Sequence, residues 1–290
     1  QTRRMRTIIE AMADRLTQVP GIVGVMLGGS RARGTHRPSS DWDLGLYYRG
    51  ELDLTALRDL AGPDVEVAAP GGWGPWVNGG AWLQVDGVAV DWILRDLDRV
   101  EQVWADCRRG SFEIGEQVGH PLGFWSPCYA GEVALGQVLT DPTGALTSLK
   151  RETATYPEPL RTALTARAFE AEFLVNAAAK GGERSDSLYV SLCLSRAIGV
   201  LVQALFAADG QWCLNEKGAL AAAEMLPGAP ANLSDRVRAV LSAIGESSTV
   251  AVELARGLTV DVLAATADGG GGVAGGAELT PADVRPGSGL

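Results

Sequence analysis

Hydrophobic positions in the first part of the chain change from helical to strand spacing. Residues 5–19 place apolar side chains three and four positions apart, and a proline–glycine pair ends this segment. The runs 22–27 and 42–48 are short, apolar and bounded by turn-forming residues, which predicts two buried strands. A short helix is predicted over 54–61. The chain therefore begins as helix, strand, strand and helix.

Two further apolar runs, 81–85 and 88–94, flank an aspartate–glycine dipeptide at 86–87. This dipeptide favours a two-residue hairpin turn because it tolerates positive φ, so the two runs are predicted to pair as antiparallel strands. A helix is predicted over 97–108, and an irregular stretch leads from there to about residue 150. A small mixed sheet with flanking helices is therefore expected over residues 1–150.

Strand spacing stops near residue 150 and helical spacing replaces it. The predicted helices are 158–180, 186–208, about 216–225, and 234–264 with a break near Gly245. The second is apolar on nearly every side, as the central helix of a bundle would be. We expect an α+β protein in which an all-α helical bundle over 151–266 follows the sheet, and a flexible glycine-rich tail over 267–290 ends the chain.

Composition narrows the classes of protein that this chain can belong to. Its 290 residues are 46% hydrophobic and 21% charged, which excludes disorder over the whole length. No apolar run reaches the roughly 20 residues of a membrane-spanning helix, and no secretory signal is visible, so a cytoplasmic protein without membrane partners is expected. The formal net charge of −10 disfavours nucleic acid as a partner and tolerates a cationic small molecule better.

Two short motifs stand at the ends of neighbouring predicted strands. Gly28-Gly29-Ser30 follows the first strand, and ten residues later Asp41-Trp42-Asp43 opens the second. Alternate residues of a strand point to the same face, so the two aspartates present their carboxylates side by side. Like charges that close are costly unless a cation lies between them, and Mg²⁺ prefers such oxygen ligands together with substrate phosphates.

A third carboxylate, Asp91, stands in the middle of the apolar run 88–94. An unpaired charge in that position costs several kcal/mol on the order of known burial penalties, so Asp91 needs a functional reason. The two glycines at the end of the first strand allow close backbone approach, and backbone N–H groups there with the Ser30 hydroxyl are candidates to hold phosphate oxygens. Arg31 and Arg33 are either surface arginines or phosphate contacts.

The loop 71–80 is unusual because it holds two tryptophans, Trp73 and Trp76, among five glycines. Exposed flexible tryptophan is costly, so the loop is expected to cover something. It either stacks on a nucleobase or an acceptor, including a cation–π contact to an amine, or it plugs the interface with the bundle.

The ordered set Gly29, Ser30, Asp41, Asp43 and Asp91 resembles the signature of the DNA polymerase beta-like nucleotidyltransferase superfamily. In that signature Gly-Ser, about ten residues, Asp-x-Asp on the next strand and a later acidic residue follow one another. The helical remainder is similar to the C-terminal bundle of small antibiotic-type nucleotidyltransferases. The resemblance implies a nucleotidyltransferase fold, with the site in the cleft between sheet and bundle. It also implies transfer of a nucleoside monophosphate, expected to be AMP, from ATP or another nucleoside triphosphate to a hydroxyl, with release of pyrophosphate.

The same resemblance assigns roles to particular residues. Asp41 and Asp43 would be ligands of Mg²⁺, with two ions expected, and Asp91 would complete the metal site, accept the hydroxyl proton, or do both. The residues expected to bind the nucleotide are Gly29, Ser30, Arg33 and Lys217. Lys217 would reach the triphosphate from the second domain as a point charge.

The acceptor is expected to be a small molecule such as an aminoglycoside, a lincosamide or another natural product, which gives the protein a role in antibiotic resistance. One alternative is the same chemistry on tRNA or a partner protein, as in toxin–antitoxin nucleotidyltransferases. Another is a catalytically silent member that only binds nucleotide, and the burial expected for Asp91 argues against it. The sequence leaves the oligomeric state open.

Overall fold

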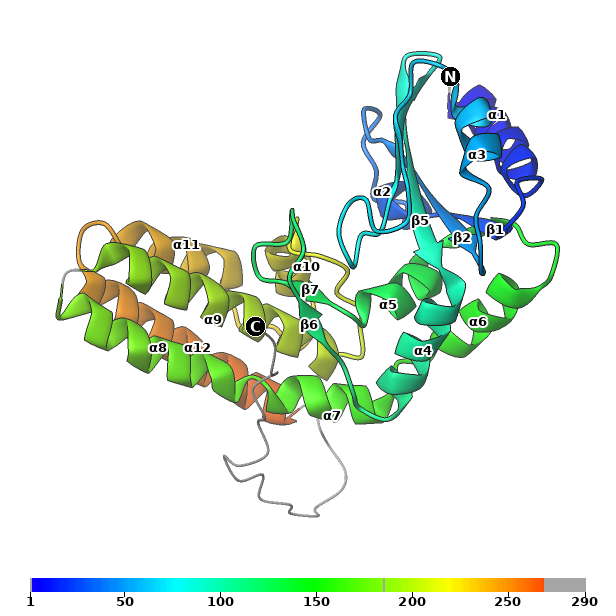
Figure 1. Cartoon of the computed structure of the whole chain (residues 1–290). Helices are drawn as coiled ribbons and strands as arrows, with labels where there is room; N and C mark the ends of the chain where they lie inside the picture. Colours follow the sequence, from blue (N-terminus) through cyan, green and yellow to red (C-terminus); the bar gives the residue numbers. More distant parts are fainter. Residues whose placement is uncertain (1, 185, 269–290) are drawn as a thin grey trace, which may run out of the picture.

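A six-stranded mixed sheet organises the N-terminal lobe of the structure, a computed structural model that describes residues 2–184 and 186–268 (Figure 1). Its strands are β1 (Ile22–Leu27), β2 (Trp42–Tyr48), β3 (Val67–Ala68), β4 (Gly80–Val85), β5 (Val88–Asp96) and β8 (Gln137–Thr140). The strand order is β3-β4-β5-β2-β1-β8. The central pair β2 and β5 runs parallel, and the other neighbours run antiparallel.

One face of the sheet is fully covered. It packs beneath α1 (Thr2–Leu16) and α3 (Leu54–Ala61), and Leu44, Leu46 and Leu94 are completely buried there. Because successive side chains of a strand alternate between the two faces, the residues between these leucines point to the opposite side.

The opposite face is covered in part by a second layer of helices, α4 (Leu97–Arg108), α5 (Cys128–Leu135) and α6 (Ala145–Thr153). Met26 and Tyr47 are buried against this layer, whereas several other positions on the same face are half-buried or exposed. This incompletely covered face is where a ligand has access to the sheet.

Aspartate side chains begin two of these helices. Asp53 accepts hydrogen bonds from the backbone N–H groups of Thr55 and Ala56 at the start of α3. Asp96 does the same for the N–H of Asp98 (3.0 Å) at the start of α4. Each is therefore an N-cap, and the Asp96-Leu97-Asp98 motif is explained by the helix that it begins.

The C-terminal lobe is a helical bundle whose core is separate from that of the sheet (Figure 1). Its main helices are α8 (Phe169–Gly182), α9 (Ser187–Ala208), α11 (Leu233–Ala243) and α12 (Ser248–Asp268). By length and composition α9 is apolar enough to cross a membrane, with a mean hydropathy of 1.8 over 18 residues. In this fold α9 packs against α8, α11 and α12, and 61% of that apolar window is buried.

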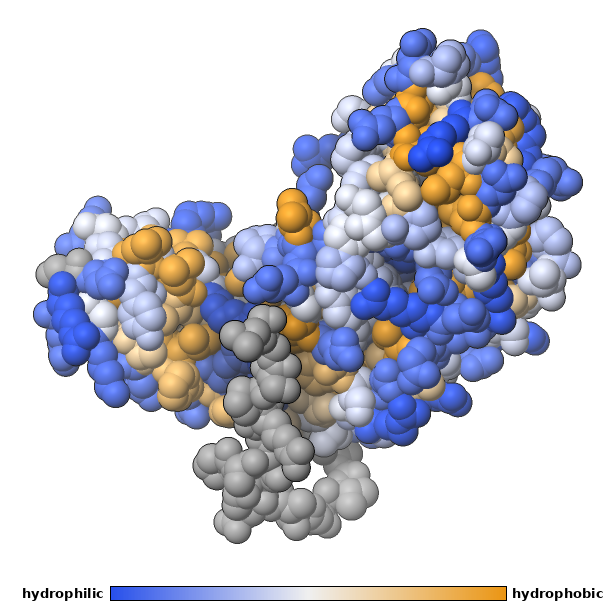
Figure 2. Space-filling view, in the orientation of Figure 1, coloured by the Kyte–Doolittle hydropathy of each residue, from blue (hydrophilic) through white to orange (hydrophobic). Residues whose placement is uncertain are grey.

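Hydrophobic side chains also reach the surface of the bundle over α8 and α9 (Figure 2). They are Phe169, Phe173, Leu188 and Leu192, each more than half exposed. The spacing of four residues within each pair places both members on one side of their helix.

The predicted fold class is confirmed, and several elements coincide with their predicted ranges. The runs 22–27, 42–48, 54–61 and 97–108 are β1, β2, α3 and α4. The hairpin of β4 and β5 is antiparallel, with positive φ at both turn residues as its dipeptide predicted. The break near Gly245 separates α11 from α12, and 187–208 forms α9.

Other predicted elements are wrong. The single helix predicted over 158–180 is two helices, α7 (Glu158–Ala166) and α8, and the intervening Arg167–Ala168 turn lets the chain enter the bundle. Helical spacing continues across this turn, so periodicity does not reveal it. The helix predicted from residue 216 begins at Ala219, since Gly218 has φ of +76°. The first helix ends at Leu16 and not at residue 19.

The stretch before residue 150 is more regular than predicted. It contains α5, α6 and β8, and β8 pairs with β1 at one edge of the sheet. Residues 267 and 268 of the predicted tail belong to α12, and the rest of that tail lies outside the described residues. The domain boundary near residue 150 stays a prediction.

Candidate active site

Two glycines hold the end of β1 against the start of β2. The Gly28 N–H donates a hydrogen bond to the Asp43 carbonyl oxygen (2.8 Å). Gly29 follows with φ of +60°, and a Cβ on it would lie 1.8 Å from Asp43 Oδ2. Only glycine combines this backbone conformation with so close an approach. The Gly-Gly-Ser turn and the Asp-x-Asp motif therefore meet at the Asp43 carboxylate.

Asp43 and Asp91 are direct partners in the register of the parallel strands β2 and β5, so their side chains lie on the same face of the sheet. Burial, and then the charges of Asp41 and Glu132, raise the pKa of Asp43. Burial, and then the charges of Asp43 and Asp41, raise the pKa of Asp91 to about 6. The three aspartates are thus close enough for their charges to repel one another.

Asp41 lies in the segment before β2 and is exposed. Arg31 fixes this segment, because its Nε donates to the carbonyl oxygens of Ser40 and Asp41 at 3.0 Å each. The Arg31 guanidinium also lies 4.5 Å from the centroid of the Trp42 ring. Arg31 is therefore occupied in holding the loop that carries Asp41.

The donor chemistry of the aspartates fits Mg²⁺ that is shared with a substrate. Within residues 2–184 and 186–268, no three His, Cys, Asp or Glu side chains converge on one metal position. Asp43 and Asp91, however, supply oxygen donors on adjacent strands. Burial and then like charge raise the pKa of each, and a cation between them would offset the like-charge repulsion. Mg²⁺ is commonly held by one or two carboxylates plus substrate phosphates.

A cavity of about 150 Å³ opens beside Asp43, between the sheet, α5 and the segment that follows α9. It is lined by Met26, Leu27, Gly28, Gly29, Arg33, Asp43, Gly45, Tyr47, Ile93, Arg95, Glu132, Leu135, Gly136, Leu214 and Asn215. Among the predicted site residues, Gly29, Arg33 and Asp43 are thus brought together. The lining, over the part of the chain that the structure describes, does not include Ser30, Asp41, Asp91 or Lys217.

Lys217 nevertheless acts on the site electrostatically, since its charge lowers the pKa of Asp43 against the effect of burial. The preceding residue, Glu216, anchors this segment by accepting a hydrogen bond from the Leu122 N–H (3.2 Å) and contacting His120 Nδ1 (3.1 Å). His120 is therefore hydrogen-bonded to the segment that carries Lys217. The roles assigned to the predicted site residues stay predictions.

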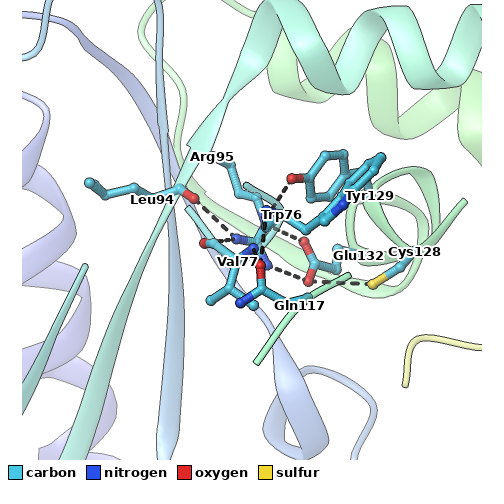
Figure 3. A network of polar contacts seen from close by, with 8 residues as sticks. All are labelled: Trp76, Val77, Leu94, Arg95, Gln117, Cys128, Tyr129 and Glu132. Atoms are coloured by element: carbon cyan, nitrogen blue, oxygen red, sulfur yellow. Dashed lines mark hydrogen bonds and ion pairs between the residues drawn. The ribbon is translucent and has the colours of Figure 1, made fainter. Parts of the chain in front are cut away.

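Arg95 and Glu132 are site residues that the sequence interpretation missed (Figure 3). Arg95 on β5 is 4% exposed, and its Nε and one terminal nitrogen donate to the two Glu132 carboxylate oxygens at 2.7 and 2.8 Å. The other terminal nitrogen donates to the carbonyl oxygens of Val77 and Leu94. The sequence carries little signal for Arg95, because this residue follows the predicted strand 88–94 and becomes part of it only in β5, which runs to Asp96.

The two tryptophans of the loop 71–80 have different environments. Trp76 is 6% exposed and stacks on Phe124 with ring centroids 5.3 Å apart, so it belongs to the core that it shares with α4 and α5. Trp73 is half-buried and stacks on Trp82 of β4 with ring centroids 4.3 Å apart. Trp76 is thus buried whereas Trp73 is not, and both predicted roles of the loop stay predictions.

Two family models and one solved structure are similar to this chain or to parts of it. Residues 5–73 match the family described as Nucleotidyltransferase domain, and residues 131–217 match Domain of unknown function (DUF4037). The search of curated proteins found no match. A solved structure titled nucleotidyltransferase-like protein, from Exiguobacterium sibiricum, is similar at 11% identity and a TM-score of 0.42, over 92% of this chain and 76% of that one. Residues 5–73, which hold the Gly-Gly-Ser turn and the Asp-x-Asp motif, thus carry the sequence pattern of a nucleotidyltransferase domain.

Proposed function

We propose that this protein transfers a nucleoside monophosphate, with AMP as the expected group, from Mg²⁺-bound ATP or another nucleoside triphosphate to a hydroxyl of a small molecule. The observation that carries the proposal is the contact of Gly29 with the Asp43 carboxylate, together with the pairing of Asp43 and Asp91 across two strands. This arrangement puts a close backbone turn and two carboxylates at one place on an accessible sheet face.

One group of residues would bind the phosphates of the nucleotide, and a second group would hold Mg²⁺. Gly29 and Ser30 would hold phosphate oxygens through backbone N–H groups and the hydroxyl, and Arg33 and Lys217 would bind the triphosphate as cations. Mg²⁺, held by Asp41, Asp43 and Asp91, would neutralise charge on the phosphates and the leaving pyrophosphate. These residues thereby orient the α-phosphorus for attack.

The transfer itself exchanges one bond to phosphorus for another. The acceptor oxygen forms a bond to the α-phosphorus, the bond between that phosphorus and the oxygen bridging to the β-phosphate breaks, and pyrophosphate leaves. The hydroxyl proton passes to an Asp91 carboxylate oxygen. Without metal the pKa of Asp91 is raised to about 6, and a bound cation would lower it, so the carboxylate is ionised at neutral pH and free to accept a proton.

A small-molecule acceptor, such as an aminoglycoside, a lincosamide or another natural product, follows from the resemblance to antibiotic-type enzymes. The net charge of −10 supports a cationic compound over a polyanion such as tRNA. Function in antibiotic resistance is part of this proposal.

Thermal unfolding with Mg²⁺ and each of the four nucleoside triphosphates tests nucleotide binding. A ligand at a hundred times its Kd adds about 2.7 kcal/mol to stability, worth several degrees in a chain of this size. We expect one triphosphate to raise the midpoint in the wild type and in Asp86→Asn, which alters an exposed turn carboxylate. The Asp43→Asn variant should not respond. No response in any protein, or equal responses in all three, would contradict the proposal.

A further inference from the structure

Trp82 is an exposed aromatic residue in register with the candidate catalytic carboxylates. It is 65% exposed, although tryptophan is a residue type that folded proteins usually cover. On β4 it is the direct partner of Asp91, which is in turn the partner of Asp43 on β2. Directly opposed residues point to the same face, so Asp43, Asp91 and Trp82 form one row across three strands.

Trp73 backs the Trp82 ring. The two rings stack with an interplanar angle of 18°. Gly80 lies beside Trp73, and its own backbone passes so close to the Trp92 carbonyl that a Cβ would lie 1.9 Å from that oxygen. A Cβ on Gly80 would lie 3.0 Å from Trp73 Cζ3. We call the stacked rings of Trp73 and Trp82 the tryptophan platform.

The tryptophan platform is held in place by a buried glutamine. The Gln117 side chain is 9% exposed; its Oε1 accepts hydrogen bonds from the N–H groups of Trp76 and Val77 at 3.0 Å each. Its Nε2 donates to the Trp73 carbonyl oxygen at 2.6 Å. These bonds fix the backbone of a loop that would otherwise be free to move through its glycines, so the platform exists before a ligand arrives.

The row has a polar end and an aromatic end. At the polar end the Asp43 carboxylate touches Gly29, and the adjoining cavity is lined by Arg33, which suits a triphosphate. At the aromatic end Trp82 lies beside Asp91, the residue that would accept the hydroxyl proton. The attacking hydroxyl and the leaving pyrophosphate must lie on opposite sides of the α-phosphorus, so the aromatic end belongs to the acceptor.

We propose that the tryptophan platform binds the acceptor, and that the acceptor carries its reacting hydroxyl on a ring with a flat apolar face. This inference rests on the proposed nucleotidyl transfer. Opposed side chains have Cβ atoms about 4.5–5.5 Å apart, comparable to the width of one six-membered ring. A ligand ring stacked on Trp82 therefore holds a substituent hydroxyl over Asp91. An amine on the ligand ring is stabilised by cation–π contact with the tryptophan and by the charge of the nearby carboxylates.

Fluorine NMR of protein labelled with 5-fluorotryptophan tests the platform directly. The Trp82 resonance is assigned from its loss in Trp82→Phe, and the probes are kanamycin A, spectinomycin and lincomycin, with acyclic sorbitol as the counter-probe. With Mg²⁺ and ATP present, we expect at least one ring compound to shift the Trp82 resonance and sorbitol to leave it unchanged. If no ring compound shifts it while ATP binds, the inference is overturned.

Steady-state kinetics with the compound that shifts the resonance give the second readout. Trp82→Ala should raise the KM for that compound about tenfold or more, and Trp82→Phe should restore most of the loss. The KM for ATP should not change. The matched control Phe173→Ala removes an equally exposed aromatic ring from α8 and should behave as wild type.

An unchanged acceptor KM in Trp82→Ala would overturn the inference. So would an ATP-induced shift of the Trp82 resonance with a raised KM for ATP, because the platform would then hold the nucleobase. If no nucleoside triphosphate binds at all, the proposed nucleotidyl transfer fails, whereas a ring compound that still shifts the Trp82 resonance supports the platform by itself.

Discussion

Gly29 is the residue at which backbone conformation and site chemistry depend most closely on one another. Its φ of +60° disfavours any side chain, and the Asp43 carboxylate occupies the place of its Cβ. Gly34 has a similar φ of +72° and open space around its Cβ position. The two glycines therefore separate backbone strain from the loss of the carboxylate contact.

Gly34→Ala is expected to cost roughly 1–2 kcal/mol of stability through backbone strain alone. Gly29→Ala should cost more, and should also abolish Mg²⁺-dependent ATP binding because Asp43 is displaced. Urea unfolding and titration calorimetry with ATP measure the two effects. Equal ATP affinity in both variants would show that the contact with Asp43 is unimportant.

The ionised Asp91 carboxylate is predicted to lower the stability of the folded protein at neutral pH. Its folded pKa of about 6 exceeds the ordinary value of 3.8, so the fold favours the protonated form. This favourable contribution is complete below pH 3.8 and is lost as the pH rises through about 6. Without Mg²⁺, Asp91→Asn should therefore be more stable than wild type by about 1 kcal/mol at pH 7.5, after allowance for partial exposure.

Urea midpoints at pH 4 and pH 7.5 check this pH dependence. The stability difference between Asp91→Asn and wild type should appear at pH 7.5 and shrink toward zero at pH 4. Asp86→Asn, in the exposed turn of the same hairpin, is the control for removal of a carboxylate away from the site. A destabilised Asp91→Asn protein at pH 7.5 would mean that the carboxylate is structural.

At the scale of elements, the Arg95–Glu132 pair joins β5 to α5 beside the cavity (Figure 3). Removing Glu132, whose side chain is 27% exposed, leaves the buried Arg95 charge uncompensated, so Glu132→Ala should cost about 3 kcal/mol, the lower end of the range for buried pairs. The double variant Arg95→Met, Glu132→Leu should recover much of that loss, because well-packed apolar residues replace such pairs at little cost. Denaturant unfolding measures both. A double variant as unstable as Glu132→Ala would contradict this account.

The elements that the sequence predicted well are those whose pattern is local. β1, β2, α3 and α4 are bounded by turn formers or aspartate caps that act within a few residues. β8 was missed because its four half-buried residues become a strand only by pairing with β1, more than a hundred residues earlier. The spacing of residues within 137–140 does not indicate which distant segment this strand pairs with.

The candidate site likewise contains residues that a local pattern predicts and residues whose role depends on the tertiary fold. The alternation rule placed Asp43 on a strand face, and the pairing with Asp91 followed from a strand order that no local pattern fixes. Trp82 lies in a strand whose residues alternate between buried and exposed, so its exposure alone does not mark it as a site residue. Only the strand register, which pairs it with Asp91, does so. Arg95 is buried only because α5 supplies Glu132.

At the scale of the whole molecule, the site draws on both lobes. Leu214 and Asn215, from the segment after α9, line the cavity under the sheet, and the charge of Lys217 reaches Asp43. The bundle therefore contributes to the site as well as to stability.

Lys217→Ala is expected to raise the KM for ATP about tenfold while AMP binding stays nearly unchanged, because the lysine would contact the outer phosphates. Lys180→Ala removes a lysine on α8 and serves as the control. Initial rates and AMP titrations measure these effects. A Lys217→Ala variant with wild-type KM for ATP would remove this residue from the nucleotide site.

The most direct test of nucleotidyl transfer is the position at which ATP is cleaved. Purified protein is incubated with Mg²⁺ and ATP labelled at the α-phosphate, with and without the ring hydroxyl compounds named above, and the products are separated. The account predicts pyrophosphate and labelled AMP, free or joined to the acceptor, in wild type and in Asp86→Asn, and none in Asp43→Asn. Formation of ADP and phosphate instead, or pyrophosphate release that survives Asp43→Asn, would contradict it.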